Sequence, residues 1–113
     1  MNSSATSTGG FIDTAALAVR ERKPGWRGRS FDSLSMTFVQ YEFDAGASIH
    51  EHAHPQEEVW QILEGELEIS IGGETRRAGA GFVGIVRPDT RHSVRALTAG
   101  KAIVTDFPRR ATD

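Results

Sequence analysis

The chain has 113 residues, of which 38% are hydrophobic and 25% are charged, and its 13 basic and 15 acidic residues leave a formal net charge of −2. This length and composition predict one globular domain and exclude two full domains. The absence of cysteine excludes disulfides, thiolate metal sites and cysteine nucleophiles. The near balance of charge argues against polyanion binding, so we expect no nucleic-acid partner.

Strongly apolar stretches are short. The longest, residues 82–86, is far below the roughly 20 residues that a membrane-spanning helix requires. The chain also opens without a charged and then apolar leader. We therefore expect a soluble, cytoplasmic protein with no membrane partner.

The N-terminal third differs in composition from the rest. Residues 1–10 are small and polar, so we expect a disordered arm. Residues 11–33 are an N-terminal extension and loop, in which apolar spacing over residues 11–20 favours one short helix. Residues 20–29 hold five of the 13 cations around Trp26. They are either an anion- or nucleic-acid-binding patch or a solvated loop anchored by the indole, and a short basic run alone favours the loop.

From residue 34 to residue 113 the pattern is that of a β domain. Apolar, β-branched and aromatic runs end at Gly, Pro or Asp about every eight to twelve residues, which is typical of a sandwich or barrel. Gly72-Gly73 between two such runs predicts a two-residue hairpin turn. The expected strands are residues 34–43, 48–54, 59–63, 67–71, 74–77, 82–86, 92–97 and 101–107.

Histidines are concentrated in one of these strands. His50, His52 and His54 alternate with other residues, which places their side chains on one face of an extended strand. Same-face neighbours lie about 6.6 Å apart, so two imidazoles can bind one ion at about 2.0–2.1 Å. After the following turn, Glu58 can reach the same ion. Its neighbour Glu57 points to the opposite face, so only one of the two carboxylates is a ligand.

A further donor has to come from another strand, and His92 is the remaining histidine. A lone strand histidine is usually a hydrogen-bonded residue without a metal, but every histidine of this chain lies where a site needs one. We therefore predict one divalent metal ion. Nitrogen and oxygen donors fit Fe, Mn, Ni, Zn or Cu, and we favour Fe or Mn for chemistry.

Residues 46–65 resemble the first cupin motif, in which a glycine precedes His-x-His, a glutamate and a second glycine. These positions are met by Gly46, His52, His54, Glu58 and Gly65. The second cupin motif is met in part. Gly81 and His92 match it, whereas Arg87, Asp89 and Ala96 stand where that motif has Pro, Gly and Asn.

The resemblance covers residues 34–107 and implies an all-β fold, the cupin double-stranded β-helix or jelly-roll-type barrel. It implies a metal ion held inside the barrel by His52, His54, Glu58 and His92. It also implies a small-molecule ligand in the lumen. The apolar outer face around Val59 and Leu63 fits a homodimer of the kind that cupins form.

Strand parity places Trp60 and Ile62 on the same face as Glu58, toward the pocket. The full set of expected pocket residues is Met36, Phe38, Tyr41, Trp60, Ile62, Arg91 and Phe107. Glu57 and His50 are the candidate catalytic residues for proton transfer. Arg87 and Arg91 flank the turn before His92, where they either attract an anionic substrate or solvate a loop.

Three functions fit these features. The one we favour is a metalloenzyme acting on a small oxygenated organic anion, by oxygenation of an enol or diketone chelate. The second is an isomerase or tautomerase of a sugar or uronate. It is suggested by residues 106–110 (DFPRR), which resemble the Asp-x-Phe-x-Pro-x-Arg ending of small cupins that act on unsaturated uronates from pectin and alginate, although those cupins favour Gln where Glu58 stands. The third is a non-catalytic module that binds a small acid or sugar.

Overall fold

A computed structural model describes residues 4–6 and 9–111. Eleven strands and one short 3-10 turn make up its regular structure, so the all-β prediction is confirmed. The larger sheet contains β1 (Ser4–Thr6), β2 (Arg20–Lys23), β3 (Trp26–Asp32), β4 (Thr37–Phe43), β6 (Glu57–Glu64), β9 (Val83–Val86) and β11 (Gly100–Phe107). The smaller sheet contains β5 (Ser48–His52), β7 (Leu67–Ile71), β8 (Glu74–Ala78) and β10 (His92–Ala96).

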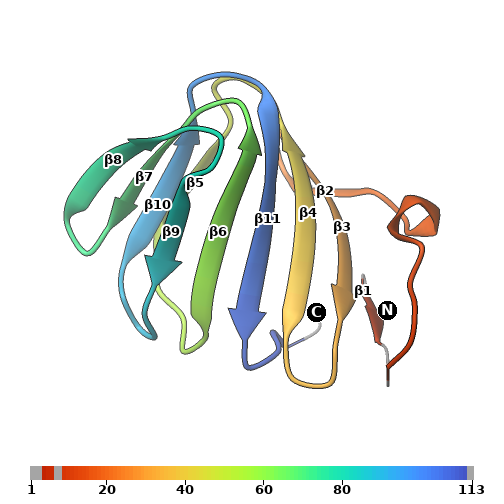
Figure 1. Cartoon of the computed structure of the whole chain (residues 1–113). Coiled ribbons are helices and arrows are strands. Elements are labelled where there is room, and N and C mark those ends of the chain that lie inside the picture. Colours follow the sequence, from red (N-terminus) through yellow and green to blue (C-terminus); the bar gives the residue numbers. More distant parts are fainter. Residues whose placement is uncertain (1–3, 7–8, 112–113) are drawn as a thin grey trace.

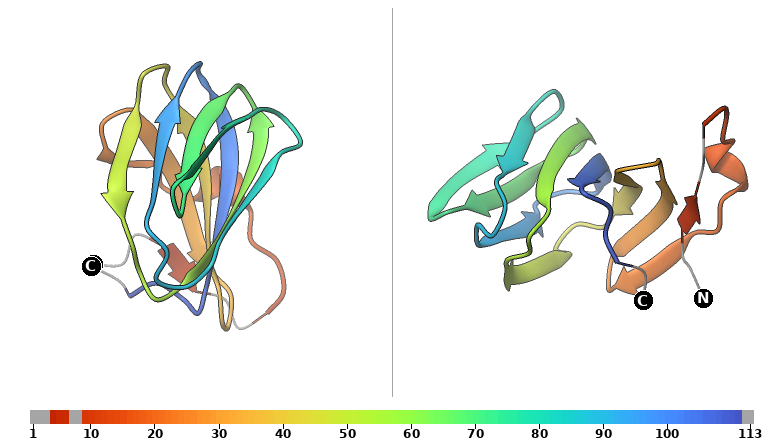
Figure 2. Two further views of the ribbon diagram at one scale, coloured as in Figure 1. Left: turned by 90° about the vertical axis from the view of Figure 1, so that its left-hand side faces the viewer. Right: turned by 90° about the horizontal axis from the view of Figure 1, so that it is seen from below.

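The two sheets form the walls of the barrel (Figures 1 and 2). The larger one has the strand order β1-β3-β4-β11-β6-β9, with β2 paired to β3, and the smaller one has the order β5-β10-β7-β8. Strands β11 and β6 pair antiparallel, with Ala102 opposite Ile62 and Asp106 opposite Glu58. Because of this register, Ala102 and Ile62 point inward side by side near one end of the barrel, and Asp106 and Glu58 do so near the other end.

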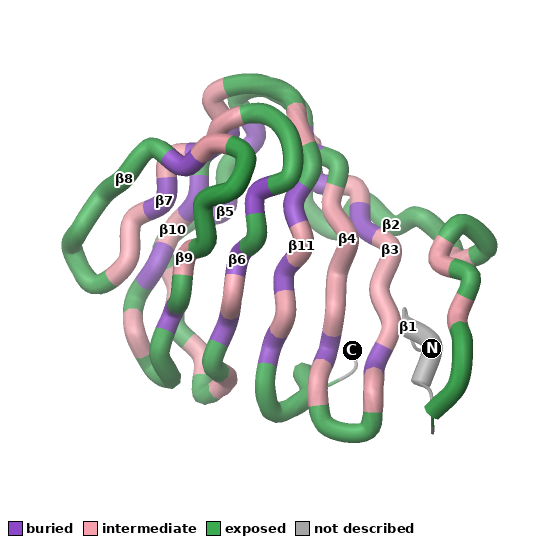
Figure 3. Tube along the Cα trace, in the orientation of Figure 1, coloured by how far each residue is buried: buried purple, intermediate pink, exposed green. Residues whose placement is uncertain are grey.

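The apolar core fills one end of the space between the sheets. Trp26 and Phe43 from the larger sheet meet Leu67 from the smaller one, and all three are almost fully buried. The Trp26 ring lies 5.3 Å from that of Phe43 and 5.8 Å from that of Trp60. Figure 3 shows buried positions alternating with half-buried or exposed ones along β6 and β11, as expected for strands with one face in the core.

From residue 34 onward each expected strand is present, with ends shifted by up to three residues. Gly72 and Gly73 have φ angles of 55° and 89°, the left-handed values that a tight two-residue hairpin turn needs at both positions. The hairpin prediction is therefore confirmed. Within the described residues, the chain forms no helix long and apolar enough to cross a membrane.

The N-terminal region departs from the predictions. Residues 4–6, which we expected to belong to a disordered arm, form β1 and pair in parallel with β3. Small polar side chains do not prevent this, because strands pair through backbone hydrogen bonds. Residues 1–3 and 7–8 of the expected arm lie outside the described part of the chain. The expected helix over residues 11–20 is only the 3-10 turn Thr14–Ala16, capped by Asp13. The expected loop over residues 20–29 is instead the hairpin of β2 and β3, which turns at Gly25 with a φ of 83°.

Candidate metal centre

The predicted metal ligands come together from three parts of the chain. His52 ends β5, His54 follows it in the turn, Glu58 lies in β6 and His92 begins β10. His52 and His92 are directly opposite each other in the β5–β10 ladder, and their ring centroids are 4.2 Å apart. One ring nitrogen from each of the three histidines lies within 4.8 Å of the other two, a spacing that could hold one metal ion.

Backbone carbonyls fix the orientation of all three imidazoles. The Nδ1 atoms of His52, His54 and His92 lie 2.8, 3.1 and 2.8 Å from carbonyl oxygens of residues 50, 56 and 90. When Nδ1–H donates to a carbonyl, the neutral ring keeps its lone pair on Nε2. Each ring is thus held in the tautomer that leaves Nε2 available as a ligand.

The Glu58 carboxylate lies between the imidazoles. Its Oε1 is 3.1 Å from Nε2 of His54, and its Oε2 is 3.3 Å from Nε2 of His92. The indole N–H of Trp60 donates to the same Oε2 at 2.5 Å. Burial raises the pKa of Glu58, but the proximity of His92 and the hydrogen bond from the Trp60 indole outweigh burial and lower the pKa to about 2, so this buried side chain is a carboxylate.

His92 supplies an independent test of whether these residues fit a metal ion. Its side chain is 1% exposed, and its Nε2 is buried without a hydrogen-bond partner among the described residues. A buried polar atom without a partner is costly, and a metal ion would satisfy it. Three imidazole nitrogens and one carboxylate also form a donor set that suits a divalent transition metal. The residues therefore fit the ion.

Asp106 is a site residue that the strand pattern did not single out. It is buried in β11, and one of its oxygens lies within 4.8 Å of ligand atoms of His54 and Glu58. Burial and the charge of Glu58 raise the pKa of Asp106 to about 7, although Arg110 acts in the opposite direction. Alternation along β11 could not identify it, because Ala102 and Val104 on one face and Ile103 on the other are all apolar.

Arg110 connects this carboxyl group to the end of the chain. Its Nη1 lies 3.4 Å from Oδ2 of Asp106 and 3.9 Å from Oε1 of Glu58. Its backbone N–H donates to the Thr37 hydroxyl at 2.9 Å, and that hydroxyl donates to the buried Asp32 carboxylate at 2.7 Å. The backbone of Arg110 is therefore held against β4, and its guanidinium extends from there to Asp106 and Glu58.

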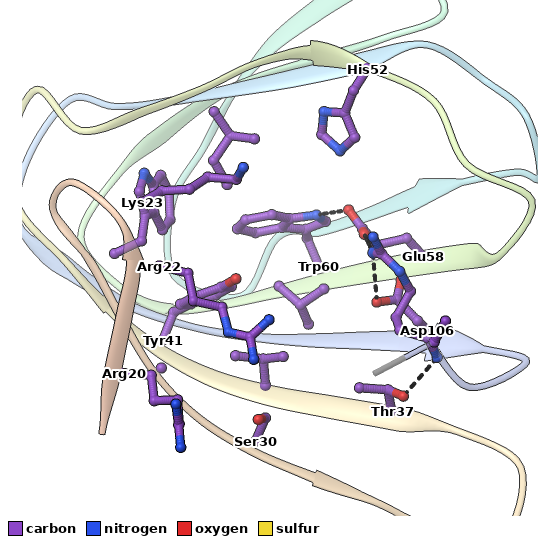
Figure 4. Close-up of a pocket in the computed structure, with 17 residues that line it drawn as sticks. Arg20, Arg22, Lys23, Ser30, Thr37, Tyr41, His52, Glu58, Trp60 and Asp106 are labelled. Carbon is purple, nitrogen blue, oxygen red and sulfur yellow. Dashed lines mark hydrogen bonds and ion pairs between the residues drawn. The ribbon is translucent and has the colours of Figure 1, made fainter. Parts of the chain in front are cut away.

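A cavity of about 380 Å³ adjoins the centre. His52, Glu58 and Asp106 line one side of it, as Figure 4 shows. Tyr41 and Trp60, whose rings stack with centroids 6.1 Å apart, line its middle. The volume is in the lower part of the range for small-molecule pockets, roughly 300–1,000 Å³.

The structure places two of the predicted pocket residues, Tyr41 and Trp60, in the cavity wall. Ile62 is buried in the core cluster and does not line the cavity. The residues that lie elsewhere are Met36, Phe38, Arg91 and Phe107. The inward positions of β4 are Thr37, Val39 and Tyr41, so Phe38 faces outward and stacks on Phe31 at 5.0 Å. In β11 the inward position is Asp106, which leaves Phe107 exposed.

The predicted catalytic residues Glu57 and His50 are both exposed and lie outside the cavity wall. A register shift in the β5–β10 ladder explains His50, because between His52 and Ile49 two residues of β5 lie opposite a single residue of β10, Ser93. This β-bulge turns Ile49 inward and breaks the expected alternation of histidines. Arg91 and Arg87 are likewise exposed, and Arg91 pairs with Glu51 at 3.4 Å.

Comparisons with known proteins agree with this geometry. The profile of the cupin domain matches residues 39–108. The chain belongs to the cupin family. A search of curated protein sequences finds no match.

Solved structures with a similar fold include an RmlC-like cupin from Shewanella frigidimarina, 25% identical, with a TM-score of 0.85 over 91% of this chain and 94% of that one. KdgF from a Halomonas species is 24% identical, with a TM-score of 0.83 over 91% and 96% of the two chains. A predicted oxalate decarboxylase from Thermotoga maritima is 17% identical, with a TM-score of 0.77 over 88% and 99%. The last two similarities establish the fold alone.

Proposed function

We propose that this cupin is a mononuclear, metal-dependent enzyme that acts on a small oxygenated organic anion. The observation that carries the proposal is the set of three imidazoles whose Nδ1 atoms are held by carbonyls and whose remaining nitrogens gather beside a buried carboxylate at the cavity wall. His52, His54, His92 and Glu58 would hold the ion. When bound, a divalent ion supplies a Lewis acid for an oxygen of the substrate.

The cavity favours proton transfer, as in tautomerisation of a sugar or uronate, over oxygenation. Asp106 supports this choice, because it places a carboxyl group in the cavity wall beside the metal ligands. Its Oδ1 is buried without a hydrogen-bond partner among the described residues, while Arg110 contacts Oδ2. The Asp106 carboxyl group is therefore the group that takes a proton from the substrate or gives one back.

Other side chains of the cavity position the substrate. The stacked rings of Tyr41 and Trp60 offer a flat apolar surface to a sugar ring or planar enol. Trp60 also fixes Glu58 through its indole N–H. The aliphatic side chains of Val39, Ile49 and Val104 complete the apolar part of the wall.

Metal analysis of matched histidine variants tests the centre. His52→Ala removes a predicted ligand, whereas His50→Ala removes an exposed imidazole from the same strand. We expect the native protein and His50→Ala to hold equimolar metal and His52→Ala to lose it. Retention of metal in His52→Ala, or equal loss in the two variants, would contradict the site.

Turnover assays on the metal-loaded protein test the reaction. We expect loss of the chromophore of a 4,5-unsaturated uronate, and we expect Asp106→Asn to abolish it while metal content is kept. Consumption of O₂ with a β-diketone would instead assign oxygenation. Tight ligand binding without turnover under any reconstituted metal would assign a binding module.

We also propose that a second copy of the chain covers the outer face of β6 and β9. This face exposes Leu63, Val83 and Ile85, which keep 48%, 53% and 56% of their accessible surface. Ile85→Lys should convert a dimer to a monomer in sedimentation equilibrium, whereas Leu34→Lys, in the turn between β3 and β4, should leave the dimer intact. A monomeric native protein would contradict the proposal.

A further inference from the structure

The Tyr41 ring is fixed in the cavity wall by its neighbours. It stacks on the Trp60 ring at 6.1 Å and meets the Trp26 ring edge-on at 5.5 Å. Gly28 lies opposite Tyr41 in the β3–β4 ladder, and a Cβ atom at Gly28 would lie only 3.2 Å from Cε1 of Tyr41. The missing side chain thus leaves room for the ring. In Figure 4 the Tyr41 side chain lies below Trp60 and extends into the cavity.

The Tyr41 hydroxyl has no use in the fold itself. It makes no hydrogen bond within residues 4–6 and 9–111, yet its oxygen is not among the buried polar atoms that lack a partner. The oxygen is therefore accessible, on a ring that lines the cavity. A phenylalanine ring could make the same contacts with Trp26 and Trp60, so packing does not require the hydroxyl. Polar groups on the wall of an apolar pocket are the ones that orient a ligand.

The surroundings keep this phenol protonated. Burial and the charge of Glu58 raise the pKa of Tyr41 above its ordinary value of 10, and the charge of Asp106 raises it further. Arg110 and Arg22 act in the opposite direction without reversing the shift. At neutral pH the hydroxyl can therefore donate one hydrogen bond and accept others. It suits a hydroxyl or a carbonyl oxygen of a ligand.

Tyr41 and the metal ligands lie at different levels of the barrel. In the ladders with β11, Tyr41 is opposite Ala102, whereas Glu58 is opposite Asp106. These levels are four residues apart, about 13 Å along a strand. Trp60 connects them, because its indole N–H donates to Glu58 and its ring stacks on Tyr41. A substrate with its reacting oxygen at the metal centre thus presents its more distant oxygens to Tyr41.

We propose that the Tyr41 hydroxyl is a substrate-binding group, which hydrogen-bonds a substrate oxygen away from the metal centre and selects substrates that carry an oxygen there. The inference rests on the proposed function and adds a specificity-determining residue to it. A site that hydrogen-bonds its substrate discriminates strongly against analogues without the matching oxygen. Tyr41 moves no proton, so its loss weakens binding and leaves proton transfer at Asp106 intact.

Calorimetric titration of the metal-loaded protein with galacturonate tests the hydroxyl. Tyr41→Phe keeps the ring and removes only the hydroxyl. We expect it to bind galacturonate about tenfold more weakly than the native protein, which corresponds to about 1.4 kcal/mol. Thr105→Val removes a hydroxyl from the outward face of β11, away from the cavity, and should bind as the native protein does. Metal content should be unchanged in both variants. In turnover of the unsaturated uronate, Tyr41→Phe should raise KM and leave kcat unchanged.

A spectroscopic test needs no variant, because Tyr41 is the only tyrosine of the chain. Protein labelled with ¹³C at Cζ of tyrosine gives one labelled NMR signal, from the carbon that carries the hydroxyl. We expect saturating galacturonate to shift this signal in the native protein and in Thr105→Val. The measurement tests the inference even if Tyr41→Phe does not fold.

Three results would overturn the inference: galacturonate binding by Tyr41→Phe as tight as by the native protein, equal weakening in Thr105→Val, or an NMR signal unchanged at about 10 mM galacturonate. The same titrations on metal-free protein separate it from the proposed function. If metal does not affect galacturonate binding but Tyr41→Phe weakens it, the role of Tyr41 is supported and that of the metal centre is contradicted. If metal tightens binding but Tyr41→Phe does not weaken it, the proposed function is supported and this inference fails.

Discussion

The two ends of the barrel interior are built by the same strands but by different forces. Strand β6 places Ile62 at the apolar end and Glu58 at the polar end, and β11 does the same with Ala102 and Asp106. The two levels are four residues apart, about 13 Å along a strand. Side-chain packing stabilises the apolar end. At the polar end, Glu58 accepts a hydrogen bond from Trp60, whereas Nε2 of His92 and Oδ1 of Asp106 are buried without a hydrogen-bond partner among the described residues. Stability and chemistry are thus separated along each strand.

The largest expected effect on stability is at the apolar end. Phe43→Ala removes a ring that is 1% exposed and packs on Trp26. We expect the unfolding free energy to fall by about 3–5 kcal/mol, measured by urea unfolding of the metal-free protein. The folded fraction should still bind metal. Loss of metal binding by a protein that remains folded would show that the two ends are not separable.

The polar end should show the reverse behaviour. His92→Ala removes a predicted ligand and a partner of the buried Glu58. Metal content should fall toward zero in elemental analysis, and the unfolding free energy of the metal-free protein should fall by only about 1–3 kcal/mol. If the unfolding free energy of His92→Ala falls as far as that of Phe43→Ala, the polar end stabilises the fold as much as the apolar end does, and the two ends do not divide stability and metal binding between them.

The pH dependence of the metal-free protein sharpens the comparison. The pKa of Asp106 is raised from its ordinary 3.8 to about 7, so the folded chain holds a proton that the unfolded chain releases in this window. The proton that Asp106 keeps only in the folded chain therefore lowers the unfolding free energy as the pH rises from about 4 to about 7. Glu58, with its pKa lowered to about 2, acts the other way, and its stabilisation is lost as the pH falls from about 4.5 toward 2.

Asp106→Asn isolates the first of these contributions. Urea unfolding of native and variant protein at several pH values should give a difference in stability that shifts in favour of the variant between about pH 4 and pH 7. Below pH 4 the difference should stop changing. Parallel curves for the two proteins over the whole window would show that Asp106 does not titrate as its buried surroundings require.

The smallest effect is expected outside the barrel. Arg27 pairs with Asp44 through two hydrogen bonds of 3.0 and 3.1 Å, but both groups face water. Exposed ion pairs contribute little because water screens them. Arg27→Gln should therefore leave the urea midpoint and the metal content unchanged. A loss comparable to that of His92→Ala would mean that burial is not what distinguishes the polar end.

The sequence predicted those parts of the site that depend on local pattern. The clustered histidines and Glu58 flank one turn, and His92 was the remaining histidine, so their convergence could be expected. The exposure of His50 could not, because it depends on a β-bulge set by pairing with β10. Asp106 and Arg110 were missed as site residues because the inward face of β11 is fixed by its register with β4 and β6. Strand β2 was predicted as a loop because its residues, RERK, are all charged and show no alternation of apolar and polar side chains.

X-ray absorption fine structure of the metal-loaded protein identifies the atoms that bind the ion. We expect imidazole scattering from the three histidines together with oxygen scattering from Glu58. His92→Ala should lower the imidazole contribution if any metal remains. An ion surrounded by oxygen alone, or a spectrum unchanged in His92→Ala, would contradict the claim that these imidazoles form the metal centre.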